Sequence, residues 1–239
     1  MKTMKMIASA LFATVALAAS NAQTVPSVNA AGYIKVTCPP DKFQFIQNPF
    51  KTFDGTSLTL SGVVGTSMPS LTRFYVWDAT KQEFDSFTYI AGVGLIDSKA
   101  KPTEGPIMNR GVGFYIKTPA SAHVSDLFLF GEVPGTSSSG QTQLQALPGF
   151  NAIGFPYPVA TLLSESGLDT ATEHNDRAYV WLPDAQDFDV ATRYVIPTYP
   201  LMKWSKDFTI PAGGVVFVKK NGTQAGTFTC NVPYSWPNN

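Results

Sequence analysis

The chain has 239 residues, with 17 basic and 17 acidic side chains and a formal net charge of +0 at pH 7. This balance gives no basic face for a nucleic acid and no acidic tail. Charged residues make up only 14% of the chain and aromatic residues 13%, with 19 glycines and 18 prolines. Such a composition is typical of an exported all-β protein rather than of a helical enzyme.

The N-terminus has the features of a secretory signal peptide. Lys2 and Lys5 precede an apolar run at residues 6–19, and small residues at 20–22 precede a cleavage site. We therefore predict a signal peptide over residues 1–22 and export to the periplasm, the cell surface or the extracellular space. Cleavage would leave 217 residues with 15 basic and 17 acidic side chains. No later segment approaches the roughly 18 apolar residues of a membrane helix, so we expect no membrane span.

Downstream of the signal peptide, short apolar runs alternate with turn formers, which predicts β-strands. In the first half they are expected at 33–38, 43–47, 58–64, 73–78, 83–90, 112–118 and 126–133. In the second half they are expected at 142–147, 151–155, 177–182, 187–196, 207–210, 214–219 and 226–232. Residues 159–166 are the one segment for which the sequence predicts a short helix.

The two halves repeat the same blocks in the same order. The pairs are FQFIQNPF and FNAIGFPY, RFYVWDATKQEFD and RAYVWLPDAQDFD, GVGFYIK and GGVVFVK, and GEVP and CNVP. In chain order their first residues are offset by 107, 104, 102 and 99 positions. Four blocks at a slowly drifting offset indicate a duplication.

A Gly/Ser/Thr-rich stretch, PGTSSSGQT at 134–142, lies between the copies and has the composition of a flexible linker. Each copy has a length of about 100 residues, which suits a small β domain. We predict an all-β protein of two tandem homologous modules, sandwich-like or barrel-like, over residues 23–139 and 140–239. A pseudo-two-fold axis is expected to relate them.

The repeated strand carries aromatic residues at alternate positions, which places them on one face. A tight turn would put Trp77 opposite Phe84 and Trp181 opposite Phe188, a cross-strand pair worth up to about 1 kcal/mol. These rings could form the core of each module or a flat sugar-stacking platform. The core is the favoured interpretation, because both copies keep the rings while their loops diverge. The predicted repeat core consists of Tyr75, Trp77, Phe84, Tyr179, Trp181 and Phe188.

Both cysteines, Cys38 and Cys230, lie beyond the signal peptide. In an oxidising compartment an even pair is expected to form a disulfide. The repeat alignment matches Cys230 with Gly131 and Cys38 with Ala146. A pseudo-two-fold axis would therefore bring the two cysteines together if it brings Gly131 to Ala146.

Catalytic motifs are sparse. His123 and His174 lie outside any motif and lack zinc-ligand spacing with the cysteines, and there is no GxSxG. Three carboxylates between Asp184 and Asp189 could hold calcium, but the first copy has Thr80 at the first of these positions. A solvated turn is the favoured interpretation. We predict no catalytic residue, no metal and no cofactor.

Aromatic residues outside the repeated blocks are the predicted ligand surface, namely Tyr199, Trp204, Tyr234 and Trp236. Exposed aromatic rings on loops of a secreted sandwich can stack on sugars. A sugar-binding function therefore predicts that at least two of the four are exposed and coplanar. For Trp204 the favoured alternative is a plug over the end of the module.

The blocks GFNAIGFP, RAYVW and GVGFYIK resemble the GWNLIxxP, YxWD and GxGYW-like pattern of β modules in secreted and cell-surface bacterial proteins. The opening NAAGYIKV is similar to the start of small exported, duplicated proteins. The resemblance implies an exported, non-catalytic β protein, mostly of unknown function, in which Trp204 is a regular feature. The chain departs from the pattern at Phe43 and Phe150, where Trp is usual, and has no C-terminal sorting segment.

Three functions are compatible with these observations. The first is an exported, non-catalytic structural or interaction protein of the bacterial envelope or extracellular matrix, with envelope or matrix proteins or polysaccharide as partners. The alternative is a pair of carbohydrate-binding modules. The third is a secreted hydrolase, which would require the histidines or the Asp184 cluster to converge in one cleft.

Overall fold

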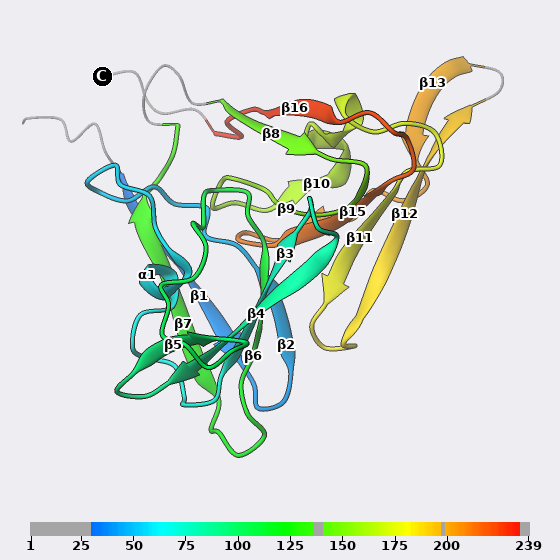
Figure 1. The fold of residues 1–239 in the computed structure, drawn as a ribbon. Coiled ribbons are helices and arrows are strands. Elements are labelled where there is room, and N and C mark those ends of the chain that lie inside the picture. The colour runs from blue at the N-terminus through cyan, green and yellow to red at the C-terminus, as the bar shows by residue number, and fades with distance from the viewer. Residues whose placement is uncertain (1–29, 136–140, 197–198, 235–239) are drawn as a thin grey trace, which may run out of the picture.

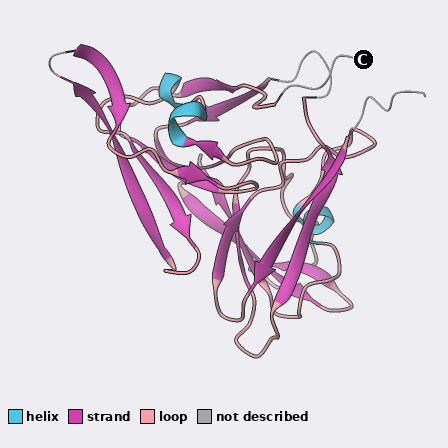
Figure 2. Cartoon of the chain, turned by 180° about the vertical axis from the view of Figure 1, so that it is seen from behind, coloured by secondary structure: helices cyan, strands magenta, loops and turns pink. Residues whose placement is uncertain are grey.

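The computed structural model describes residues 30–135, 141–196 and 199–234, and the side chains of all of these except 199–201. Antiparallel strands dominate, which confirms the all-β class (Figures 1 and 2). The first half of the chain forms the lower left of Figure 1, and the second half lies at its upper right.

Two five-stranded sheets form the body of the molecule. The first has the order β2-β6-β3-β4-β5, with β2 Phe43–Ile46, β6 Phe114–Lys117, β3 Arg73–Asp78, β4 Glu83–Ile90 and β5 Gly94–Asp97. The second has the order β9-β15-β11-β12-β13, with β9 Gly149–Gly154, β15 Val215–Lys220, β11 Arg177–Leu182, β12 Asp187–Ile196 and β13 Tyr199–Trp204. Matching sequence blocks thus occupy matching places in the two sheets. The exact symmetry and the module boundaries stay predictions.

Two-stranded pairs accompany the sheets. The pairs are β1 (Ala31–Cys38) with β7 (Ser125–Glu132), β8 (Thr142–Ala146) with β16 (Gly226–Cys230), and β10 (Thr161–Leu162) with β14 (Thr209–Ile210). Leu127 and Leu129 of β7 share a buried core with Phe74 and Phe114 of the first sheet. Phe228 of β16 does the same in a second core. Each copy therefore has its own hydrophobic core.

Backbone hydrogen bonds join the two copies in a reciprocal manner. Gln47 donates its N–H to the carbonyl of Gly213 at 2.9 Å, and Gly154 donates to the carbonyl of Gly111 at 2.8 Å. In the repeat alignment Gln47 corresponds to Gly154, and Gly111 corresponds to Gly213. In each copy the backbone N–H at the same aligned position therefore donates to the glycine turn of the other copy. A Cβ atom at Gly154 would come within 2.2 Å of Gln47 Cγ, which explains the glycine there.

Some predicted elements were wrong. The expected strand at 58–64 is the helix α1 (Leu60–Val64), whose N-cap Thr59 accepts a hydrogen bond from the N–H of Gly62. A short apolar run fits either element by pattern, and the cap decides it here. The expected helix at 159–166 is β10 followed by the 3-10 turn η1 (Leu163–Glu165), with η2 (Leu168–Thr170) after it. The sequence prediction also missed β5 and β13.

The predicted disulfide is wrong. Cys38 and Cys230 are both free and only 1% exposed, and they belong to separate cores. The reason lies in the pairing of the terminal strands. Gly131 pairs with Gly32 and Ala146 pairs with Gly226, so each first strand meets the last strand of its own copy. The contact expected between Gly131 and Ala146 does not form, so the fold does not bring the two cysteines together.

Within the described ranges, no helix has both the length and the apolar character needed to cross a membrane.

Candidate functional site

The repeated blocks build the same three rows of side chains on one face of each sheet. Strand alternation and register define the rows. In the first sheet they are Arg73 with Lys117 and Thr88, Tyr75 with Tyr115 and Ser86, and Trp77 with Phe84. In the second sheet they are Arg177 with Lys219 and Thr192, Tyr179 with Phe217 and Val190, and Trp181 with Phe188. Each face thus runs from a basic row to an aromatic end.

The predicted repeat core does not form the core of either module. The alternate residues of the same strands are buried instead, as Phe74 and Val76 are in β3 and Ala178 and Val180 in β11. The six predicted residues are half-buried, except Phe84, which is 40% exposed. The buried positions of each strand carry only apolar residues, whereas the alternate positions include Arg73 or Arg177, whose charge stays in solvent.

The aromatic rows of the two sheets meet at the seam between the copies. Trp77 and Phe84 have ring centroids 4.8 Å apart, and Trp181 and Phe188 5.0 Å apart, as the cross-strand pairing predicts. Phe217 of the second sheet lies 5.1 Å from Trp77 of the first. Edge-to-face pairs of this kind stabilise a contact beyond the area they bury.

Each tryptophan also donates its indole N–H to the other copy. Trp77 Nε1 lies 2.8 Å from the carbonyl of Phe150, and Trp181 Nε1 lies 3.2 Å from the carbonyl of Phe43. A tryptophan removed from solvent needs a partner for its indole N–H, and these carbonyls supply it. The partner lies in the opposite repeat, which no strand pattern within one copy could show.

Part of this aromatic cluster remains open as a groove. Its five lining residues are Phe43, Tyr75, Phe84, Tyr115 and Trp181, and it encloses about 360 Å³. Tyr115 and Trp181 have ring centroids 5.7 Å apart, so the groove contains rings from both copies. In the described part of the chain, neither tyrosine hydroxyl has a hydrogen-bond partner. Burial raises the pKa of Tyr115, which keeps its hydroxyl protonated and able to donate.

A basic hollow of about 330 Å³ lies directly beside the groove on the same sheet. Arg73 is exposed, and Lys117 forms an ion pair with Asp41 at 2.8 Å. Lys117 Nζ also lies 5.0 Å from the ring centroid of Phe43, a groove residue. The second copy repeats this contact between Lys219 and Phe150 at 5.5 Å. The signal for these basic residues is in the sequence, because one repeated block begins with Arg (RFYVW and RAYVW) and another ends with Lys (GVGFYIK and GGVVFVK) in both copies.

The two predicted ligand residues whose side chains are described, Trp204 and Tyr234, do not form an exposed surface. Trp204 is 8% exposed, and its Nε1 donates to Asp169 Oδ1 at 2.6 Å, while the Arg193 guanidinium lies 5.4 Å from its ring. This matches the plug interpretation. Tyr234 is half-buried, packs against the second core and donates its hydroxyl to the carbonyl of Pro134. The Tyr199 side chain and Trp236 lie outside the described residues.

The candidate catalytic groups stay apart. His123 follows β6 in the first copy, whereas His174 lies in the second, where Nδ1 accepts a hydrogen bond from Val195 N at 3.3 Å. Asp189 of the carboxylate cluster pairs with Lys206. No group of three potential metal ligands occurs among the residues with described positions.

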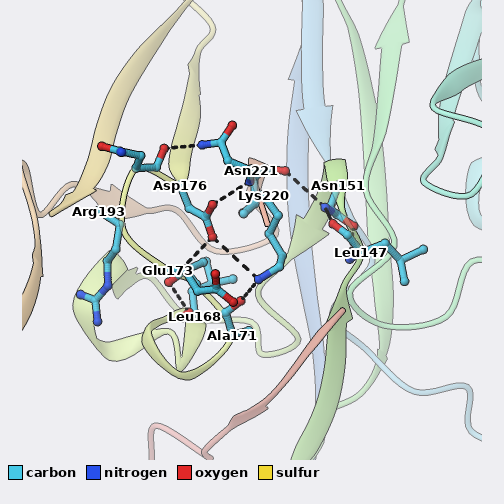
Figure 3. A network of polar contacts seen from close by, with 12 residues as sticks. Leu147, Asn151, Leu168, Ala171, Glu173, Asp176, Arg193, Lys220 and Asn221 are labelled. Carbon is cyan, nitrogen blue, oxygen red and sulfur yellow. Dashed lines mark hydrogen bonds and ion pairs between the residues drawn. The ribbon is translucent and has the colours of Figure 1, made fainter. Parts of the chain in front are cut away.

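A buried ion pair in the second copy belongs to a network of polar contacts (Figure 3). Lys220 and Asp176 have side chains 2% and 0% exposed and lie 3.8 Å apart. Asp176 accepts from the N–H groups of Glu173 and Asn221, and Lys220 donates to the carbonyl of Ala171 at 2.5 Å. These partners are backbone groups of the same copy, so the network holds the fold together and offers no open site.

An exposed apolar face on the β1–β7 pair was missed by the sequence prediction. Tyr33, Phe53, Phe128 and Phe130 are between 48% and 72% exposed. The outward positions of the corresponding β8–β16 pair are polar, namely Gln143, Gln145, Thr227 and Thr229. The available signal was the run of four apolar residues at 127–130, LFLF, because a strand with one face in solvent should alternate with polar residues.

Comparisons with models of protein families, with curated protein sequences and with solved structures find no match to this chain.

Proposed function

We propose that this protein is an exported, non-catalytic carbohydrate-binding protein whose site is the aromatic groove between its two repeats. The observation that carries the proposal is the open set of five rings with two tyrosine hydroxyls that have no partner among the described residues. Ring-lined concave sites with a few polar groups are the usual form of a ligand site.

The chemistry of a sugar suits this groove. A pyranose ring has apolar C–H faces, which stack on aromatic rings, and an equatorial rim of hydroxyls, which hydrogen-bond. Phe43, Phe84 and Trp181 supply stacking surface, and the hydroxyls of Tyr75 and Tyr115 can both donate and accept. Catalysis is not needed to explain any of these groups.

The predicted signal peptide also favours this function, because an exported protein meets polysaccharides in the envelope and matrix. The resemblance to secreted and cell-surface β modules points the same way. Both copies keep the rows of the face, so the duplication preserved more than the residues that fill the two cores.

Affinity electrophoresis tests the proposal. Residues 23–239 would run through gels containing single polysaccharides, beside the groove variants Tyr75→Ala and Phe84→Ala and the control Tyr194→Ala. Tyr194 is 37% exposed on β12 and does not line the groove. We expect retardation of the wild type and the control, with loss in the groove variants. The site would be refuted if no polysaccharide slows the wild-type protein. It would also be refuted if all variants are slowed equally and have unchanged urea midpoints.

A second candidate function is self-association as a structural component. The exposed face of Tyr33, Phe128 and Phe130 favours it, because isolated soluble chains rarely expose such a patch. Lys35 and Asp126 on this face pair with each other at 3.1 Å, so these faces of two protein molecules could meet without like-charge repulsion.

Sedimentation velocity at rising concentration tests this candidate. The variant Phe128→Thr/Phe130→Thr gives the first copy the residue type found in the second. We expect concentration-dependent dimers in the wild type and a monomer in the variant. A monomeric wild type throughout would exclude this function for the face.

A further inference from the structure

We infer that the ligand of the groove is an acidic polysaccharide, with its carboxylates on Arg73 and Lys117, and that Arg177 and Lys219 form an equivalent second site. The inference rests on the proposed carbohydrate-binding function and adds the charge of the ligand and the number of sites.

The first observation is the placement of like charges. Arg73 lies directly opposite Lys117 on neighbouring strands, and Arg177 lies directly opposite Lys219. Like charges directly opposite each other destabilise a sheet. Both copies nevertheless keep the pair, which indicates a use other than folding.

The second observation is that the two arginines have no partner among the described residues. Arg73 and Arg177 are both exposed, and within the described ranges neither takes part in an ion pair or a ring contact. A surface arginine can be a solvated charge with no role. Two such arginines at matching positions of a duplication, each beside a lysine and an aromatic row, favour a binding role.

The two basic rows differ in the carboxylates that lie near them. In the first copy Asp41 pairs with Lys117 and offsets one of the two positive charges. In the second copy no described carboxylate lies within ion-pair distance of Arg177 or Lys219. Since the chain beyond residue 22 has 15 basic and 17 acidic side chains, these rows are local positive sites on a slightly acidic protein.

The geometry suits a sugar that carries a carboxylate. Arg73 and Tyr75 are two residues apart on β3, which separates the basic row from the aromatic row by about 7 Å. A sugar ring on Tyr75 and Tyr115 would therefore bring a carboxylate of the same or the next unit to the arginine. A guanidinium binds a carboxylate through two parallel hydrogen bonds. The ring of Phe43 holds Lys117 at the sheet surface in the same row.

Matched neutral and acidic polymers test the inference. The probes are hydroxyethyl cellulose and carboxymethyl cellulose, and dextran and carboxymethyl dextran, in affinity gels at 20 and 200 mM salt. The variants are Arg73→Gln, Arg177→Gln and both together, with Lys99→Gln as a control for loss of one exposed charge. Because the two arginines have no partner among the residues whose positions are described, and each faces a like charge, these variants should have a urea midpoint equal to or above that of the wild type.

We expect stronger retardation by an acidic polymer than by its neutral counterpart. Each arginine variant should bind the acidic polymer roughly tenfold more weakly, as for one lost charge-assisted contact. The double variant should lose more than either single variant, since two sites on one chain bind with avidity. The Lys99→Gln control should behave as the wild type.

Other results have distinct meanings. Equal retardation by neutral and acidic polymers, unchanged in the arginine variants, would overturn the acidic ligand and leave carbohydrate binding in place. Retardation by no polymer would overturn both. Acidic retardation that Tyr75→Ala does not weaken, or that Lys99→Gln weakens as much as Arg73→Gln, would indicate non-specific ion exchange and overturn the site.

Discussion

The carboxamide of Gln82 forms hydrogen bonds with both backbone groups of Phe150. Its Nε2 donates to the Phe150 carbonyl at 2.9 Å, and its Oε1 accepts from the Phe150 N–H at 2.7 Å. Gln186 does the same to Phe43, at 3.1 and 2.8 Å. Both glutamines have a positive φ, 57° and 53°. A left-handed conformation costs a non-glycine residue about 1–2 kcal/mol, so both copies keep a strained residue that binds the edge strand of the other.

The first prediction concerns this glutamine contact. Gln82→Ala should lower the free energy of unfolding by about 1–3 kcal/mol, because the two hydrogen bonds to Phe150 and a third to the Ala79 carbonyl are lost while the backbone strain stays. Gln82→Gly should cost less, because glycine relieves the strain at positive φ. Urea unfolding measures both, with Gln143→Ala on the exposed face of β8 as the control. A glycine variant less stable than the alanine variant would contradict this account.

The second prediction concerns the buried pair of Asp176 and Lys220. Asp176→Thr or Lys220→Thr alone should destabilise by about 3–5 kcal/mol, since each leaves an unpaired buried charge. The double variant should lose clearly less stability than the sum of the losses of the two single variants. The first copy has Thr72 and Thr118 at these positions, both buried and each donating its hydroxyl to a carbonyl. Additive losses in a double-mutant cycle would show that the two charges are not coupled.

The third prediction concerns alkaline pH. Burial raises the pKa of Cys38 and of Cys230 from 9.0 to about 12. A group whose pKa is higher in the folded state stabilises the fold below its unfolded pKa, and this stability is lost as the pH rises toward the folded pKa. Stability should therefore decline above pH 9, with a slope of up to about 1.4 kcal/mol per pH unit for each thiol.

Urea midpoints between pH 7 and 10 measure this decline, and Cys38→Ala/Cys230→Ala should lack it below pH 10. A thiol reagent at pH 8 should label neither cysteine in the folded protein and both after unfolding. Resistance of the unfolded, unreduced protein to labelling would instead indicate a disulfide.

The fourth prediction concerns Trp204. Trp204→Phe should lower the free energy of unfolding by about 2 kcal/mol, because the hydrogen bond to the Asp169 carboxylate is lost inside the second core. The same variant should leave retardation by polysaccharides unchanged, since Trp204 does not line the groove. Loss of retardation without loss of stability would restore Trp204 as a ligand residue and contradict the plug.

Local patterns predicted most of the strands, because alternation and turn residues act within a few positions of each other. They also predicted the pairing of Trp77 with Phe84 and of Trp181 with Phe188, since a tight turn fixes register. The strand prediction for 58–64 failed because a short run with four apolar side chains fits a helix as well as a strand, and the Thr59 cap is a weak signal. The sequence prediction missed β13 because a proline, here Pro200, is rare inside a strand.

The sequence by itself determined the all-β class, because strand alternation and turn residues are local patterns. Its repeated blocks also predict a duplication, because they recur in the same order about 100 residues apart. Tertiary structure alone decided which face of the Tyr-x-Trp strand is buried and that the cysteines stay apart. It also decided that rings from both repeats form one groove. These outcomes depend on which strand of one copy meets which strand of the other, and that contact is made between residues about 100 positions apart.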